Sequence, residues 1–426
     1  MMADNIKKIY QVFEPEPLSI EDIDLYVPLD EVRGSSGLVN KLSKTIRYSA
    51  NPTCQLLAGH IGSGKSTELR RLQEELESGR EKFFTAFCTI LQDIDVEDTD
   101  FPDILIGILR QTSYQLNDKC KIKLKPGYFK QRWDELKDVL GSDVSFTGVE
   151  LAVGLANIST VIKSSPNTRL EIRKRLEPKL NNWIEAAKDV ISEAVLELKK
   201  KGFAGLVIIA DDMDKLSVER RQDIDGSTAE RLFIHRYAQL TALNCHVVYT
   251  IPLSLAYSCK ERDIASLYNL TAPPVVPMTK IIDENGKRFE DGFEKFRDVI
   301  SKRLEKAGAK ESIFENEKVK DRIIEFSAGQ PRVLMTLIRD SIVEGDIPIT
   351  LAAVKNVARK VTQSYARQLR EEHWTIIRQV KKDHILRRSE KNDALCMELL
   401  ANRAILQYLN EKEWYGLNPL LPKQAT

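Results

Sequence analysis

Short apolar runs alternate with longer amphipathic segments over the first two thirds of the chain. Unbroken apolar runs of this length, bounded by Gly, Pro or Asn, are typical of strands buried on both faces of a parallel sheet. They cover residues 54–58, 83–89, 205–210 and 245–251, with a weaker run at 275–276. Apolar residues at helical spacing over 38–48, 66–79 and 176–198 predict amphipathic helices between the strands. The alternation predicts an α/β domain built on a parallel sheet.

The same patterns divide the chain into four parts. An acidic, proline-bearing N-terminal extension precedes the strands, and a long, mostly helical insertion separates the second strand from the third. Helical patterns then continue almost to the end, where residues 404–417 are typical of a two-stranded hairpin. We predict an extension at 1–30, a sheet-containing core at 31–285 with an insertion at about 95–203, a helical segment at 286–346 and a C-terminal part at 347–426.

Composition narrows the class of protein. Of the 426 residues 42% are apolar, enough for a substantial core, so wholesale disorder is excluded. No stretch approaches the roughly 18 consecutive apolar residues of a membrane span, and the N-terminus lacks the pattern of a signal peptide. Lys+Arg 64 against Asp+Glu 63 gives no overall attraction to nucleic acid. The six cysteines are scattered without metal-ligand spacing, which predicts buried thiols in a reducing compartment. We therefore expect a cytoplasmic protein with no membrane partner.

The strongest chemical signal is the segment GHIGSGKS, which fits the pattern GxxxxGK[ST] in full. It consists of Gly59, His60, Ile61, Gly62, Ser63, Gly64, Lys65 and Ser66. Glycines let the backbone approach a phosphate chain closely, and the helix that follows directs its N-terminal N–H groups at the same anion. Lys65 is placed to reach the β- and γ-phosphates, Ser66 to ligate Mg²⁺, and Thr67 to line the same turn. A glycine-rich turn can match this pattern by chance, but the strand before it and the helix after it favour a phosphate site.

A second signal follows the third apolar run, which leads directly into Asp211 and Asp212. A Mg²⁺ ion held mainly by phosphates and water needs a carboxylate fixed at the C-terminal edge of the sheet. We assign this metal role to Asp211, and the polarisation of an attacking water to Asp212. Two alternatives stay open. Either carboxylate can instead cap the turn that follows, and Asp214 can replace Asp212 as the catalytic group.

The glycine loop, the run 206–214 that ends in DDMD, and the large insertion between them resemble bacterial P-loop ATPases of the AAA-like and signal-transduction (STAND) kind. Related forms are the NACHT, KAP and origin-recognition ATPases. The resemblance covers residues 30–345 and implies a P-loop NTPase sheet, a helical lid and a C-terminal winged-helix-like domain. It also implies ATP and Mg²⁺ as cofactors and ATP hydrolysis as the reaction. One departure is Lys215, which stands where the usual D-D-x-D-R motif has arginine.

The same resemblance suggests two further positions. Thr250, at the end of the fourth apolar run, falls where such ATPases carry a polar sensor, although it equally suits a strand that ends before a proline. The run GQPR, which ends in Arg332, is similar to the lid element that carries a sensor arginine. An arginine there is a candidate to stabilise γ-phosphate charge in catalysis, and a solvated arginine at a helix junction is the alternative. No spacing selects an arginine finger among candidates such as Arg262 and Arg303.

The C-terminal part is locally basic. Its positively charged residues include Arg359, Lys360, Arg367, Arg370, Arg378, Lys381, Lys382, Arg387 and Arg388. In one interpretation these helices grip DNA phosphates while the hairpin, as a wing, lies along a groove. The alternative, which we favour, is a solvated face on a domain that packs against the ATPase and holds it closed. Trp374, Trp414 and Tyr415 are predicted to pack in the core instead of stacking on bases.

Together these features predict an ATP-binding, ATP-hydrolysing molecular switch, in which the nucleotide bridges the α/β core and the lid. No effector pattern is evident in the chain, so the resemblance to STAND proteins implies an effector protein in trans, in bacterial defence or signalling. Self-association is a further partner option. The alternative function is a DNA-binding ATPase resembling an initiator or loader. A small-molecule P-loop kinase is disfavoured because it has no need of the insertion, the lid and the wing.

Overall fold

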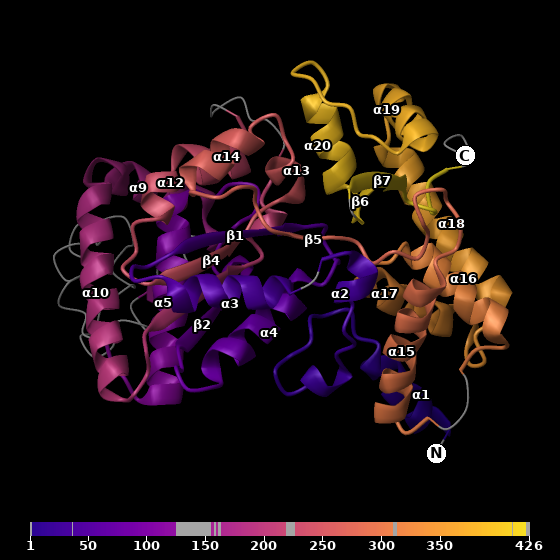
Figure 1. Cartoon of the computed structure of the whole chain (residues 1–426), viewed down its shortest axis with the longest axis horizontal. Coiled ribbons are helices and arrows are strands. Elements are labelled where there is room, and N and C mark those ends of the chain that lie inside the picture. The colour runs from indigo at the N-terminus through magenta and orange to yellow at the C-terminus, as the bar shows by residue number, and fades with distance from the viewer. Residues whose placement is uncertain are drawn as a thin grey trace.

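The protein forms an α/β body and a mostly helical body that lie side by side (Figure 1). The structure, a computed structural model, describes residues 2–35, 37–124, 155–156, 159–160, 163–218, 226–309, 313–410 and 412–422. A large part of the predicted insertion, residues 125–154, lies outside these ranges. Within them, no helix has the length and apolar character needed to cross a membrane.

A five-stranded parallel sheet forms the centre of the α/β body. Its strands are β1 (Cys54–Gly59), β2 (Phe84–Thr89), β3 (Leu206–Asp211), β4 (His246–Thr250) and β5 (Val275–Val276). Their order across the sheet is β2-β3-β4-β1-β5. All five predicted strands are confirmed, including the weak run at 275–276, which pairs with the end of β1. Because the strands are parallel, the residues that follow β1, β3 and β4 gather at one edge of the sheet.

Both faces of the sheet are buried, which explains the unbroken apolar runs. Leu57 of β1 packs toward α3 and α4, whereas Leu56 and Ala58 pack into the core on the opposite face. The helices on the two faces are α3 (Leu38–Tyr48), α4 (Lys65–Glu77), α5 (Phe101–Cys120), α10 (Leu180–Lys200), α11 (Thr228–Glu230), α12 (Tyr237–Leu240), α13 (Leu253–Ala256) and α14 (Glu261–Leu267). Full burial of a leucine such as Leu56 stabilises the fold by about 1.5–3 kcal/mol.

The helix predicted over 176–198 is interrupted near its start. The preceding helix α9 (Pro166–Leu176) ends in a 3₁₀ turn over Glu177–Lys179, and α10 begins only at Leu180. Pro178 lies in this turn and has no backbone N–H to donate, so it breaks the helical ladder. The other two predicted helices are confirmed as α3 and α4.

The helical body combines the start of the chain with its last third. Its helices are α1 (Met2–Val12), α15 (Glu290–Lys306), α16 (Glu317–Ser327), α17 (Pro331–Gly345) and α18 (Leu351–Gln368). They share a core that includes Phe13, Phe296 and Ile338. Helix α1 packs against α15, so the residues that follow α1 must cross from the helical body to α2 (Asp30–Arg33) beside the sheet.

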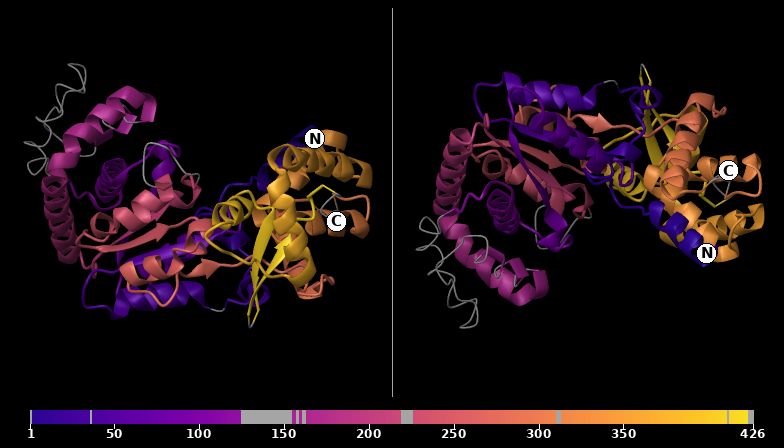
Figure 2. Two further views of the ribbon diagram at one scale, coloured as in Figure 1. Left: turned by 90° about the horizontal axis from the view of Figure 1, so that it is seen from above. Right: turned by 90° about the horizontal axis from the view of Figure 1, so that it is seen from below.

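Two helices and a hairpin follow α18 in the described part of the chain. Beyond α18 these elements are α19 (Glu371–Asp383), α20 (Asp393–Ala401), β6 (Ile405–Leu409) and β7 (Glu413–Leu417). The predicted hairpin is confirmed as the antiparallel pair β6–β7, which lies near the junction of the two bodies (Figure 2). Trp374, Trp414 and Tyr415 are buried, as predicted. The prediction of buried cysteines is confirmed for Cys88, Cys245 and Cys396; Cys54 and Cys120 are partly exposed, and it is wrong for Cys259, which is exposed after the short helix α13.

Candidate nucleotide-binding site

The glycine loop connects the end of β1 to the start of α4 at the carboxyl edge of the sheet. A Cβ at Gly59 would lie 2.9 Å from the carbonyl oxygen of Val276, so the backbone can approach β5 this closely only as glycine. Gly64 is the N-cap of α4 and has a φ of 101°, in the left-handed region that favours glycine. The start of α4 therefore points its free N–H groups and partial positive charge into the loop.

Lys65 has an acceptor for each of its three ammonium protons. Its Nζ donates to the carbonyl oxygens of Gly59 at 2.7 Å and His60 at 2.9 Å, and it forms an ion pair with Asp214 Oδ2 at 2.8 Å. An ammonium group has three donors, so a phosphate that binds Lys65 must displace one of these partners. Asp214 is the partner that a phosphate replaces most directly, because both are anions.

Asp211 ends β3 directly behind Ser66. It accepts hydrogen bonds from the Ser66 hydroxyl and from the backbone N–H of Asp212, the latter at 2.8 Å. Burial, and secondly the nearby charge of Asp214, raises the pKa of Asp211 to about 6. Carboxylate oxygens of Asp211, Asp212 and Asp214 lie within 4.8 Å of one another. Oxygen donors of this kind suit Mg²⁺, and a bound cation would hold the Asp211 carboxylate in its ionised form.

The acidic turn after β3 is fixed by two further side chains. Asp212 has a left-handed backbone, φ 71°, and pairs with Lys215 at 2.6 Å, so Lys215 neutralises the carboxylate to which the sequence assigns water polarisation. The Thr250 hydroxyl accepts hydrogen bonds from the backbone N–H groups of Met213 at 2.9 Å and Asp214 at 3.3 Å. Thr250 is fully buried, so it acts on the site through the shape of this turn.

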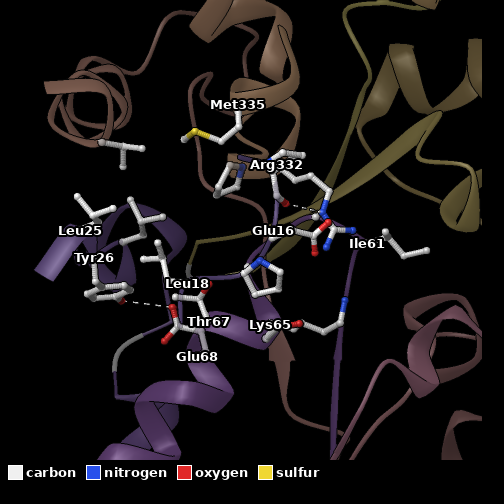
Figure 3. A pocket seen from close by; sticks show the side chains of 18 of the residues that line it. Glu16, Leu18, Leu25, Tyr26, Ile61, Lys65, Thr67, Glu68, Arg332 and Met335 are labelled. Carbon is white, nitrogen blue, oxygen red and sulfur yellow. Dashed lines mark hydrogen bonds between the residues drawn. The ribbon is translucent and has the colours of Figure 1, made fainter. Parts of the chain in front are cut away.

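A cavity that is partly open to solvent extends from the glycine loop toward the helical body (Figure 3). Its polar end is lined by Ile61, Gly62, Gly64, Lys65, Ser66, Thr67, Asp212, Asp214 and Lys215. The rest of its lining is mainly apolar, with the side chains of Pro15, Pro17, Leu18, Leu25, Val27, Leu29, Val299 and Met335, and also includes Glu16, Tyr26 and Glu68. This division suits a nucleotide, which has charged phosphates at one end and the apolar faces of a base at the other.

The apolar end is built by residues 13–29, here called the strap, together with α15 and α17. Arg332 lies beside Gly62 at the polar end, and its Nε donates to the strap carbonyl of Pro15 at 3.2 Å. Lys302 Nζ donates to two further strap carbonyls at 2.8 and 3.0 Å. The strap is therefore hydrogen-bonded to both α15 and α17. Sequence analysis missed its role because its apolar residues follow neither a helical nor a strand period.

Arg33 is a second residue that sequence analysis missed. It is 2% exposed and lies directly behind the glycine loop. Its guanidinium donates to the Ser63 carbonyl at 2.5 Å, to Glu68 Oε1 at 2.8 Å and to Thr279 Oγ1 at 3.3 Å. These bonds tie the loop, α4 and the segment after β5 to the end of α2. No motif marks Arg33, because its partners are distant in the sequence.

The side chain of His60 turns toward the C-terminal hairpin. Its Nε2 accepts a hydrogen bond from the backbone N–H of Gln407 in β6 at 2.9 Å, and the Gln407 carbonyl accepts from the N–H of Met278 at 3.2 Å. Burial, and secondly the charge of Lys65, lowers the pKa of His60 to about 3, so the ring is neutral. The backbone carbonyl of His60 thus accepts a hydrogen bond from Lys65, and its ring accepts one from the hairpin.

A parallel sheet with a glycine loop after β1, Lys65 and Ser66 at the start of α4, and an acidic turn after β3 together form a P-loop nucleotide-binding fold. Solved structures of similar fold include the Walker-type ATPase PABY2304 of Pyrococcus abyssi, with a TM-score of 0.49 and 14% identity over 97% of this chain and 99% of that chain. The ORC2 protein of Aeropyrum pernix, solved as ADPNP–ADP complexes, has a TM-score of 0.42 and 12% identity over 97% of this chain and 94% of that chain.

No protein-family model and no curated protein matches the sequence of this chain. Both TM-scores are below 0.5. The assignment of the site therefore rests on the geometry of the chain's own residues.

Proposed function

We propose that the protein binds ATP together with Mg²⁺, hydrolyses it, and uses the change of nucleotide as a conformational switch. The observation that carries this proposal is the cavity that joins the glycine loop of the α/β body to the strap and lid helices of the helical body. A ligand in this cavity touches both bodies. It can then shift their equilibrium, because the contacts differ between an open and a closed arrangement.

In this proposal the loop N–H groups and Lys65 bind phosphate oxygens, while Ser66 and Asp211 hold Mg²⁺ directly or through water. Mg²⁺ held there would supply positive charge next to the transferred phosphoryl group. Asp212 is adjacent to these groups and polarises the attacking water once Lys215 releases it. Asp212 thus exchanges its ion pair with Lys215 for the attacking water, so the rate of hydrolysis depends on the conformation of the acidic turn.

Arg332 and Thr250 are proposed to sense the nucleotide. Arg332 lies between the strap and the polar end of the cavity. Loss of the γ-phosphate charge would therefore change the contacts that Arg332 makes and, through them, the position of the lid helix α17. Thr250 bonds the turn that carries Asp214, so movement of that turn reaches β4.

The output of the switch is proposed to pass through the bond between His60 and Gln407, because any shift of the glycine loop strains the hairpin. We propose that the surface changed by nucleotide exchange is recognised by an effector protein in trans or by a second copy of the chain.

The second candidate, a DNA-binding initiator or loader, has less support. Exposed Arg367 and Lys382 on α18 and α19 favour it, since phosphate contacts need accessible positive charge. However, α20 carries no Lys or Arg and packs on α13, and the hairpin residues Leu406 and Tyr408 are buried. A gel shift over a salt series tests this function, because DNA affinity that depends on phosphate contacts falls steeply with salt.

Calorimetry with ATP and Mg²⁺ tests the main proposal. We expect saturable binding by the parent chain and none by Lys65→Met, which loses the phosphate-binding amine. Lys318→Met is the matched control, because Lys318 is exposed on α16 outside this cavity. Light scattering with and without nucleotide then reports self-association. Absence of binding by the folded parent chain, or equal binding by Lys65→Met, would contradict the proposal.

A further inference from the structure

Arg303 is a largely buried cation that lines the cavity, and among the described residues only the Val299 carbonyl accepts a hydrogen bond from it. It lies near the end of α15, is 8% exposed and lines the cavity beside Val299. Its Nη1 donates to the carbonyl of Val299, in the same helix, at 3.2 Å. A guanidinium has five N–H donors and no acceptor. Within the part of the chain that the structure describes, it has no carboxylate at ion-pair distance.

The charged groups around Arg303 come from the strap and from α15. Asp22 of the strap attracts it, but Asp22 is already bonded to Lys306 Nζ at 2.5 Å and to the Ser19 hydroxyl at 3.0 Å. Burial lowers the pKa of Arg303 to about 10, so the group remains charged at neutral pH. A largely desolvated cation that faces a cavity is stabilised by a ligand that supplies hydrogen-bond acceptors.

The phosphate end of the cavity already has its own cationic groups. Lys65, the N-terminus of α4 and Arg332 serve it. The electrostatic partners of Arg303, by contrast, belong to the strap and α15, which build the apolar end. Arg303 lines the cavity next to Val299, so its donors are available to the part of a nucleotide that is not phosphate. Purine rings offer acceptors there, the unprotonated ring nitrogens, while the strap and Met335 supply apolar walls for the ring faces.

We infer that Arg303 is a specificity-determining residue of this cavity, which donates a hydrogen bond to a ring nitrogen of a purine base. The inference rests on the proposed function and names the part of the nucleotide that the lid recognises. ATP and GTP share two such acceptors, N3 and N7, whereas N1 is an acceptor in adenine alone. The ring nitrogen that Arg303 contacts therefore decides whether the cavity binds ATP more tightly than GTP.

The test is calorimetry with ATP, GTP, UTP, inorganic tripolyphosphate, and the 1-deaza, 3-deaza and 7-deaza analogues of ATP. Each is titrated into the parent chain, Arg303→Met and Arg297→Met. Arg297 lies on the same helix but pairs at the surface with Glu290 and Asp321, so it is the matched control. Arg303→Gln, which keeps a smaller donor group, replaces the methionine variant if that variant does not fold.

We expect one deaza analogue to bind the parent chain at least about tenfold more weakly than ATP, the effect of losing a hydrogen bond to a charged donor. In Arg303→Met, ATP affinity falls to the level of that analogue and the difference disappears. Tripolyphosphate binds both chains equally, and Arg297→Met behaves as the parent. The melting temperature of ligand-free Arg303→Met equals or exceeds that of the parent, because a desolvated cation has been removed.

Other outcomes overturn the inference. If Arg303→Met weakens ATP, the three analogues and tripolyphosphate by the same factor, Arg303 has a structural role. If UTP binds the parent chain as tightly as ATP, no purine is selected. Purine binding that is unchanged in Arg303→Met refutes the inference alone. A folded parent chain that binds no nucleotide refutes the proposed function as well, so the two failures are distinguishable.

Discussion

Replacement of His60 by alanine tests whether the hairpin is bonded to the glycine loop. The ring is 2% exposed, and its Nε2 is the acceptor for the Gln407 N–H. Without it a buried N–H loses its partner, which costs about 1–3 kcal/mol. Loss of the buried ring adds about 2 kcal/mol, the low end for large-to-small changes in a core. We therefore expect His60→Ala to destabilise the fold by about 3–5 kcal/mol, a large share of the 5–15 kcal/mol typical of a domain.

The assay is urea unfolding together with hydrogen exchange of the Gln407 amide. A local loss of about 3 kcal/mol corresponds to roughly 100-fold faster exchange at that amide. His246→Ala is the matched control, because His246 Nδ1 also accepts a backbone N–H, that of Thr53 at 3.2 Å, but at the far end of the sheet. If exchange at Gln407 is unchanged in folded His60→Ala, or rises equally in both variants, the link between loop and hairpin is refuted.

Three further predictions concern acid stability and the acidic turn. The pKa of His60 is lowered to about 3 in the folded chain, so its contribution to stability is present above about pH 6.5 and is lost as the pH falls toward 3. His60→Gln should therefore remove up to about 1.4 kcal/mol per pH unit from the slope of unfolding free energy between pH 6.5 and 3, and an unchanged slope contradicts this. Asp212→Asn should lower ATP turnover about 100-fold or more while ATP affinity changes only a few-fold, measured by phosphate release and calorimetry; equal turnover excludes the water-polarising role. Thr250→Val leaves two buried N–H groups unpaired and should cost about 2 kcal/mol in thermal unfolding, whereas Thr250→Ser keeps the acceptor and serves as control; equal melting of the two variants argues against this bond.

The sequence predicts those features that depend on neighbouring residues. The strands, the glycine loop and the C-terminal hairpin each have a local signature. Their positions follow from the spacing of apolar residues and from the Gly, Pro and Asn residues that bound them. The acidic pair after β3 follows in the same way, because strand and carboxylates are contiguous. The break in the long helix also has a local signature, Pro178, and was open to prediction.

The missed features depend on residues that are distant in the sequence. Arg33 donates a hydrogen bond to Thr279, which lies 246 positions away in the sequence, and no local pattern predicts that contact. The strap becomes a wall of the cavity only when α15 and α17 pack against it. Arg303 is one arginine among many in the sequence, and only burial beside the cavity distinguishes it. The direction of the His60 ring is likewise set by the hairpin.

The bond between His60 and Gln407 spans 347 positions of the chain. A ribosome that adds about 5–20 residues per second takes roughly 17–70 s to travel from one to the other. Throughout that interval the nascent glycine loop lacks its final support, and the surface that β6 later covers is open to water. The glycine loop therefore acquires this hydrogen bond only after β6 has been synthesised and has docked.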